Sequence, residues 1–245
     1  MEERLDKILL QRGLVSSRVR AEQIIREVGV KVNGKLISKT GKKFPIDATI
    51  EMIAEELPWV SRGALKLLEA LEAWNPSVEN ACILDVGAST GGFTEVLLSK
   101  NAKKVFCIDV GKDQLHAKLK SDERVINLEK THVRDLTTRL IPELADGCVI
   151  DVSFISLEKI FPFLHPFLKE DAFVIALVKP QFEVGKDNIA KGGIVKNKAL
   201  YPEVIQQIIK SAEANNLSYE THISSPILGG DGNEEFLMLL KRKTN

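Results

Sequence analysis

The sequence has few cysteines, and nothing in their arrangement suggests a metal site or a disulfide. Cys82, Cys107 and Cys148 each lie in or beside an apolar run, and their spacing fits neither a zinc site nor a disulfide framework. We therefore interpret them as reduced core residues of a cytoplasmic protein, and we predict no metal site.

Membrane-directed segments are lacking as well. No apolar run approaches the length that a membrane-spanning helix needs. The first ten residues, "MEERLDKILL", are acidic and then amphipathic, without the basic region and apolar stretch of a signal peptide. Internal repeats and low-complexity segments are absent too. We therefore expect a soluble globular protein that does not act at a membrane.

The net charge of the chain is zero, but the charges are unevenly distributed. Residues 1–50 hold 11 Lys and Arg against 6 Asp and Glu, whereas residues 51–245 hold 23 against 28. A basic module ahead of a mildly acidic body favours a polyanion as the partner of the first part. The alternative is ordinary solvation of a small domain's surface.

The first fifty residues predict a small domain of two helices and a sheet. Apolar residues at helical spacing predict a first helix that ends at Gly13, and Ser16 or Ser17 can cap a second helix from about 18 to 27. The stretch "VKVNGKLI" alternates around Asn33-Gly34, which is a strong hairpin signal. Pro58 and Gly63 then punctuate a linker. We place a first domain at 1–57, the linker at 58–62 and a larger domain at 63–245.

A glycine-rich turn opens the larger domain. In "ACILDVGASTGGFTEVLLSK" a buried strand runs into a turn at Gly87–Gly92 and then into a helix, and the next strand ends at Asp109, 24 residues beyond Asp85. Glycines let a ligand approach the backbone closely, and the N–H groups of the following helix face it. An acid at the end of the second strand is typical of a residue that binds ribose hydroxyls.

Five interpretations of this turn compete. A phosphate-binding P-loop requires Gly-Lys-Ser/Thr where the chain has Gly91-Gly92-Phe93, and the glycine spacing is a poor match to a dinucleotide fingerprint. The segment Gly87–Gly91 is a literal G-x-S-x-G, and Asp151 and His222 follow Ser89 in the order of an α/β-hydrolase triad. Only a helix is predicted ahead of the sheet, however, and an oxyanion-hole loop is missing, so we consider the hydrolase a weak alternative. A mere strand-to-helix turn does not account for the two acids.

The remaining interpretation is an S-adenosylmethionine site. Asp85 would orient the loop, Asp109 would hold the ribose, and the turn residues would leave room for the methionine end of the cofactor. These turn residues are Gly87, Ser89, Thr90, Gly91 and Gly92.

Further strands and helices alternate after the turn, which predicts a doubly wound α/β sheet of mostly parallel strands. We expect strands at "RVINLE", "GCVIDVSF" and "AFVIALV", an interrupted helix at "SLEKIFPFLHPFL", and a terminal antiparallel pair of strands. Asp151 ends one predicted strand and Lys179 ends the next. Ligands bind outside the carboxyl ends of such strands, so the two side chains can meet there. Lys66 lies in the helix before the first strand, and Glu235 opens the last strand.

The set Lys66, Asp151, Lys179 and Glu235 resembles the catalytic K-D-K-E tetrad of the FtsJ-type ribose 2′-O-methyltransferases. More closely, the chain resembles the hemolysin-A-like (TlyA) family of ribosomal RNA methyltransferases. The segments that carry the resemblance are "VSRGALKL", "LDVGASTGGFT", "DVSFISL", "KPQFEVG", "GGIVKN" and "SPILGGDGNEEF". The family usually has asparagine where this chain has His132, which the resemblance places near the adenine.

The first domain resembles the S4 RNA-binding domain, an α+β fold. The matching residues are Arg4-Leu5-Asp6, Ser17-Arg18, Ala21, Val32-Asn33-Gly34 and Lys39. One departure is Val28, which stands where the family usually has glycine. The resemblance implies an RNA-facing surface made of Arg4, Arg18, Arg20, Lys31 and Lys35.

Together the resemblances imply S-adenosylmethionine-dependent methylation of a ribose 2′-OH. They also imply that the methylated nucleoside is a cytidine in ribosomal RNA. An amine of pKa about 10.4 is a poor base at neutral pH, but desolvation and a second nearby ammonium can lower it. Lys179 could therefore remove the 2′-OH proton, or it could stay cationic and orient the hydroxyl. Three alternatives to catalysis remain: a purely structural salt-bridge network, a non-catalytic assembly factor that binds RNA, and a membrane-lytic hemolysin.

Overall fold

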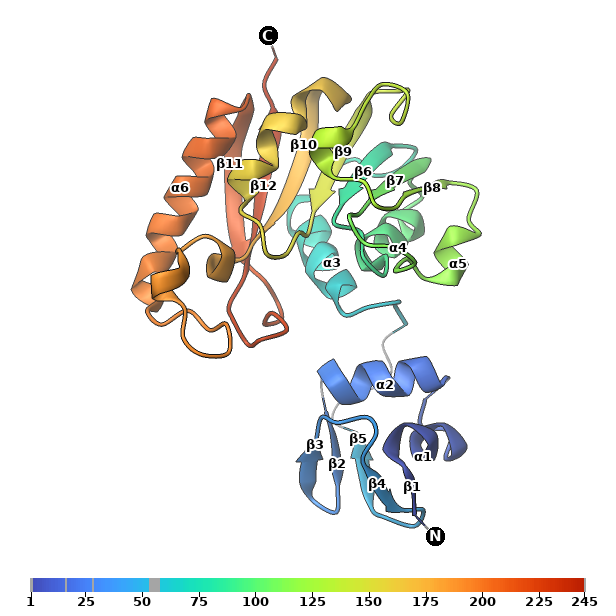
Figure 1. Ribbon diagram of the computed structural model, residues 1–245. Helices are drawn as coiled ribbons and strands as arrows, with labels where there is room; N and C mark the ends of the chain where they lie inside the picture. The colour runs from blue at the N-terminus through green and yellow to red at the C-terminus, as the bar shows by residue number, and fades with distance from the viewer. Residues whose placement is uncertain (1, 16, 28, 53–57, 245) are drawn as a thin grey trace. The chain divides into compact units, whose positions relative to one another are not determined.

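A computed structural model describes every residue except 1, 16, 28, 53–57 and 245. The chain divides into two compact units, Met1–Pro58 and Trp59–Asn245, which are described separately (Figure 1). The end of the predicted first domain (53–57), the predicted cap Ser16 and the unusual Val28 lie outside the described residues.

The first unit has two helices packed on small sheets. Its elements are β1 (Glu2–Arg4), α1 (Leu5–Gln11), α2 (Arg18–Glu27), β2 (Val30–Val32), β3 (Lys35–Ile37), β4 (Lys43–Pro45) and β5 (Ile50–Met52). The hydroxyl of Ser17 caps α2 by accepting the N–H of Arg20 at 3.2 Å. The hairpin turn between β2 and β3 has positive φ at Asn33 (50°) and Gly34 (76°), as a two-residue turn of this sequence requires. Strands β1, β4 and β5 were not predicted.

The second unit is a seven-stranded sheet with the order β11-β12-β10-β9-β6-β7-β8. Strands β6 to β10 are parallel, and β12 is antiparallel to both β10 and β11, as predicted. The strands are β6 (Cys82–Val86), β7 (Lys104–Ile108), β8 (Val125–Leu128), β9 (Ala145–Ile150), β10 (Leu168–Val178), β11 (Leu217–Ser224) and β12 (Phe236–Arg242).

Each face of this sheet has its own apolar core. Helices α3 (Gly63–Trp74), α4 (Gly92–Ser99) and the short α5 (Ala117–Lys120) contribute to one core. Helix α6 (Tyr201–Ala214) and the segment 157–168 contribute to the other. Because both faces are covered, the central strands are almost entirely apolar, as the fully buried "CILDV" of β6 illustrates.

The structure differs from the sequence prediction in the segment 157–167. The predicted interrupted helix is a series of three short 3₁₀ turns, Leu157–Lys159, Phe161–Phe163 and His165–Phe167. Pro162 and Pro166 each lie in the first positions of a turn, where the missing N–H is tolerated, and prevent a continuous helix. Helix α5 was not predicted. No described helix combines the length and the apolar character that crossing a membrane requires.

Candidate functional site

Two polar side chains meet at the carboxyl edge of the sheet. Strands β9 and β10 pair in parallel up to Ile150 and Ala176, and β10 continues to Val178, so that Asp151 and Lys179 directly follow neighbouring strands. Lys179 Nζ lies 2.6 Å from Asp151 Oδ1 and donates a hydrogen bond to Ser153 Oγ at 2.8 Å. The side chain of Lys179 is 10% exposed and that of Asp151 22%. The sequence analysis predicted this meeting, and Ser153 is an additional partner.

A second ion pair is more deeply buried. Lys66 Nζ on α3 lies 2.5 Å from Glu235 Oε2, and the two side chains are 9% and 2% exposed. Glu235 directly precedes β12 and reaches the carboxyl edge because β12 runs antiparallel to its neighbour. Gly229 packs against the carboxylate: a Cβ at this position would lie 2.5 Å from Glu235 Oε1, so a larger residue would displace it.

Helix α3 borders both ion pairs. A Cβ built on Gly63, the first residue of α3, would lie 3.9 Å from Asp151 Oδ2, and Lys66 follows one turn later on the same helix. The structure therefore brings the four residues of the predicted tetrad to one edge of the sheet as two pairs of opposite charge.

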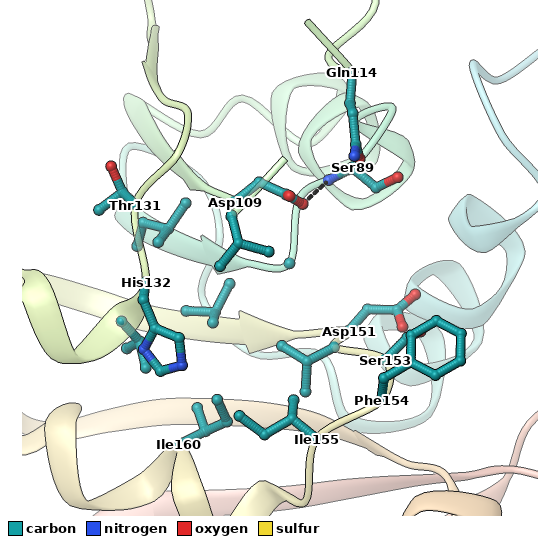
Figure 2. A pocket seen from close by; sticks show the side chains of 16 residues that line it. Ser89, Asp109, Gln114, Thr131, His132, Asp151, Ser153, Phe154, Ile155 and Ile160 are labelled. Atoms are coloured by element: carbon teal, nitrogen blue, oxygen red, sulfur yellow. Dashed lines mark hydrogen bonds between the residues drawn. The ribbon is translucent and has the colours of Figure 1, made fainter. Parts of the chain in front are cut away.

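A cavity of about 460 Å³ adjoins Asp151 (Figure 2). Loops that follow β6, β7, β8 and β9 form it, which is the expected place for a ligand of an open α/β sheet. Its polar lining consists of Ser89, Asp109, Gln114, Thr131, His132, Asp151 and Ser153.

Asp109 and His132 are fixed in the cavity wall by backbone N–H groups. The two carboxylate oxygens of Asp109 accept the N–H groups of Ser89 and Gly111, each at 2.7 Å. His132 Nδ1 accepts the N–H of Arg134 at 3.1 Å, so the neutral ring carries its proton on Nε2. Both side chains are thereby oriented without any ligand.

Asp85 lies beneath the glycine turn and is fully buried. Its Oδ2 accepts the hydroxyl of Thr94 at 2.6 Å, which ties β6 to α4, while Oδ1 has no hydrogen-bond partner among the described residues. Burial, together with the Asp151 and Asp109 carboxylates, raises the pKa of Asp85 to about 7, although the Thr94 hydrogen bonds oppose the shift. Asp85 is not among the residues that line the cavity.

The glycines of the turn permit close packing. A Cβ on Gly91 would lie 2.2 Å from Leu119 Cδ1, and one on Gly92 would lie 2.2 Å from Ser61 Oγ. A Cβ on Gly87 would lie 2.3 Å from the carbonyl oxygen of Asp151. Gly87 and Ser89 line the cavity, whereas Thr90, Gly91 and Gly92 are not part of its lining. The first two glycines also have positive φ, 85° at Gly87 and 95° at Gly91.

Phe154 is a lining residue that the sequence analysis missed. Its side chain is 90% exposed, its φ is 64°, and its ring centroid lies 5.1 Å from that of Phe182. A positive φ is unusual for a bulky residue and often marks a functional position. The sequence signal was an aromatic residue three positions after Asp151.

The hydrolase triad is not formed. His222 lies in β11 at the far edge of the sheet, where its Nδ1 is 2.7 Å from the hydroxyl of Tyr219. Three strands separate β11 from β6, which carries the turn with Ser89.

The predicted RNA-facing residues of the first unit are partly neutralised. Arg4 and Arg18 both bind the buried Asp6, with Nε–Oδ distances of 2.9 and 2.7 Å. Burial alone would raise the pKa of Asp6, but the hydrogen bonds from the two guanidinium groups lower it to about 2. Lys31 pairs with Glu51 at 2.9 Å. Lys35 is exposed and has no ion pair among the described residues, and the backbone N–H of Arg20 binds Ser17.

Comparisons with known proteins match both units. The FtsJ-like methyltransferase family matches residues 59–242, and the S4 domain matches residues 3–50. The Bacillus subtilis protein named "Putative rRNA methyltransferase YqxC" is 41% identical and aligns with 98% of this chain and 85% of its own length. The Mycobacterium tuberculosis 16S/23S rRNA (cytidine-2′-O)-methyltransferase TlyA is 39% identical, over 99% of this chain and 91% of its own. A solved structure titled "Putative hemolysin from Streptococcus thermophilus" is 38% identical, with a TM-score of 0.79, and covers 100% of this chain and 90% of its own.

Proposed function

The chain belongs to the FtsJ-like methyltransferase family, as the sequence resemblance indicated, and from that premise we propose that it methylates the ribose 2′-OH of a cytidine in ribosomal RNA. The relative named as a cytidine-2′-O rRNA methyltransferase is similar over almost the whole chain and supports the choice of nucleoside and substrate. The S4 domain ahead of the methyltransferase domain supports an RNA substrate.

The observation that carries the proposal is the meeting of two lysines and two carboxylates at one edge of the sheet. Lys179 with Asp151, and Lys66 with Glu235, form buried or nearly buried ion pairs, and Asp151 also lines a cavity of ligand size. Groups of this kind are costly to bury for stability alone. Their position at the carboxyl ends of the strands is where this fold class binds ligands.

The cavity would hold S-adenosylmethionine, which supplies an electrophilic methyl group on a sulfonium when it is bound. Asp109 would accept hydrogen bonds from the ribose hydroxyls, since a carboxylate retains further lone pairs after accepting two N–H groups. His132 Nε2–H would donate to the adenine. Asp85 would hold the turn in place from beneath, through its hydrogen bond with Thr94.

Lys179 would act on the acceptor. Its amine is held between Asp151 Oδ1 and Ser153 Oγ, so its position is fixed before RNA binds. From there it would hold the 2′-OH in line for attack and take or share its proton as the oxygen forms the new bond. Lys66 and Glu235 balance the charge of the cluster, and Asp151 keeps Lys179 oriented.

The S4 unit would capture the RNA. Arg4 and Arg18 are held in place by the shared Asp6, yet their side chains remain 34% and 49% exposed. Fixed guanidinium groups of this kind suit phosphate contacts, which position an RNA without reading its sequence.

Mass mapping of ribose methylation in ribosomal RNA tests the proposal. RNA from a deletion strain should lack one or more cytidine 2′-O-methyl groups, and the wild-type gene should restore them whereas a Lys179→Ala gene should not. An unchanged methylation map would refute the function. If RNA maturation failed but the Lys179→Ala gene restored it fully, the protein would be a non-catalytic assembly factor. Leakage of dye from liposomes upon addition of the protein would instead support a lytic role.

A further inference from the structure

The segment between Lys179 and α6 is long and has a defined conformation although it holds little regular structure. Residues 185–198 fold back on themselves as a small hairpin, in which Ile189 bridges Val195, Ala190 N–H binds Ile194 O at 2.7 Å and Lys196 N–H binds Asn188 O at 2.9 Å. Gly192 and Gly193 form its tip with φ of 96° and 84°, which favours glycine at both positions. Long ordered loops of this kind are usually functional.

A buried asparagine fastens this hairpin to the segment that delivers Glu235. The side chain of Asn233 is 2% exposed; its Oδ1 accepts the N–H of Val195 at 3.0 Å and its Nδ2 donates to Gly193 O at 2.9 Å. The neighbouring Glu234 forms an ion pair with Lys198. Figure 1 shows this loop, in orange, beside the red loop between β11 and β12.

Two residues of the tetrad are close in the sequence to the hairpin or to its anchor, Asn233. Lys179 lies six residues before Gly185, and Glu235 lies two residues after Asn233. Glu235 in turn contacts Lys66 at 2.5 Å. The hairpin therefore lies next to the edge of the sheet at which the acceptor nucleotide must bind.

The hairpin carries a net positive charge, whereas the rest of the second unit carries a net negative charge. Residues 185–198 contain Lys186, Lys191, Lys196 and Lys198 against Asp187, a net charge of +3. The rest of residues 59–245 has 19 Lys and Arg against 24 Asp and Glu, a net charge of −5. Lys186 and Lys191 are exposed, and neither forms an ion pair within the described part of the chain. Positive charge kept unneutralised on an acidic surface is typical of a polyanion-binding site.

We propose that the hairpin 185–198 is a second RNA-binding element, which contacts phosphates of the substrate RNA beside the target nucleotide and is anchored to the catalytic edge by Asn233. This inference rests on the proposed function and adds to the S4 unit a contact on the methyltransferase unit itself. Its phosphate contacts are independent of sequence, so it would fix the RNA backbone near the tetrad while other residues select the base.

The test is a charge reversal with a matched control. The double variant Lys186→Glu/Lys191→Glu is compared with Lys100→Glu/Lys103→Glu, two exposed lysines near the amino ends of the strands, on the opposite edge of the same sheet. Affinity for unmethylated large-subunit ribosomal RNA is measured by filter binding from 50 to 200 mM salt. The hairpin variant should bind about tenfold or more weakly, and its salt slope should fall by about one for each phosphate that it no longer neutralises.

The control variant should keep the wild-type affinity and slope. Calorimetric S-adenosylmethionine binding and the melting temperature should be unchanged in both variants, because the exchanged lysines are exposed and make no ion pair in the described structure. An Asn233→Ala variant should lower RNA affinity in the same direction by releasing the hairpin. Equal RNA affinities for the hairpin variant and the wild type, or an equal loss in the control variant, would overturn the proposal. If the wild type binds this RNA but methylates no ribosomal RNA, the proposed function fails while the binding result still decides the role of the hairpin.

Discussion

Breaking the buried Lys66–Glu235 pair should destabilise the methyltransferase unit strongly. Glu235→Ala leaves the ammonium of Lys66, whose side chain is 9% exposed, without its partner 2.5 Å away. Removal of one member of a buried ion pair costs about 3–5 kcal/mol, because the remaining charge stays desolvated. For a unit of this size that corresponds to a decrease in melting temperature of roughly 6–20 °C.

The neighbouring residue provides a matched control. Glu234 also pairs with a lysine, Lys198, but these side chains are 43% and 68% exposed. Exposed ion pairs contribute about 0–1 kcal/mol, so Glu234→Ala should change the free energy of unfolding by less than about 1 kcal/mol. The two substituted glutamates are neighbours in the sequence. Their expected effects on stability differ because one ion pair is buried and the other is exposed.

Urea unfolding followed by tryptophan fluorescence measures this difference. Both tryptophans, Trp59 and Trp74, belong to the methyltransferase unit, so the signal does not report the S4 unit. The double variant Lys66→Met/Glu235→Leu removes both charges and should regain most of the lost stability. It should remain inactive, because the proposed tetrad is incomplete, and this separates the proposed role of the pair in the reaction from its structural one. A cost below about 1 kcal/mol for Glu235→Ala would refute the reasoning from burial.

Three further predictions concern single residues of the site. Lys179→Ala should reduce turnover by about 10²-fold or more while calorimetric cofactor binding stays nearly unchanged, and Lys179→Arg should also fail, because a guanidinium cannot act as a base; full activity of the arginine variant would leave only a requirement for positive charge. Asp109→Ala should weaken S-adenosylmethionine binding by about 1–3 kcal/mol in calorimetry, and unchanged affinity would contradict its placement at the ribose. The third prediction follows from the pKa of Asp85, raised by burial from 3.8 to about 7. Protonation of Asp85 then favours the folded state, so this stabilisation is complete below about pH 4 and is lost as the pH rises through 7, by a few kcal/mol at about 1.36 per pKa unit. Asp85→Asn should flatten the difference in unfolding free energy between pH 4 and 8, and an unchanged pH profile would indicate that Asp85 is ionised throughout.

The parallel strands themselves could be predicted from the sequence because they depend on local patterns, whereas the place of β9 beside β6, and not beside β8, could not. Apolar runs between glycine and proline signals mark the strands, and sequential parallel strands tend to be neighbours. The meeting of Asp151 and Lys179 followed from that rule alone. The pairing of Lys66 with Glu235 was not predicted, because 169 residues separate them and the family resemblance suggested only that both belong to one tetrad.

Other features depended on contacts that no local pattern contains. Gly91 and Gly92 were expected to make room for a ligand, but they pack against Leu119 and Ser61, which belong to other segments. Arg4 and Arg18 were expected to face RNA, yet both also bind Asp6, since a carboxylate at full burial requires partners. The hairpin held by Asn233 was missed because its shape depends on a buried amide 38 residues beyond Val195.

The reversed direction of β12 also affects the order in which the site can be completed. Five parallel strands present their carboxyl ends to the ligand, and β12, the last strand in the chain, presents its beginning to the same edge. Glu235 can take its place only when β12 has inserted between β10 and β11, so a chain truncated within β12 would lose one ion pair of the tetrad, although the residues that line the cavity all precede β11. During synthesis, ligand binding could therefore precede catalysis, and an unfinished chain would be unable to modify RNA.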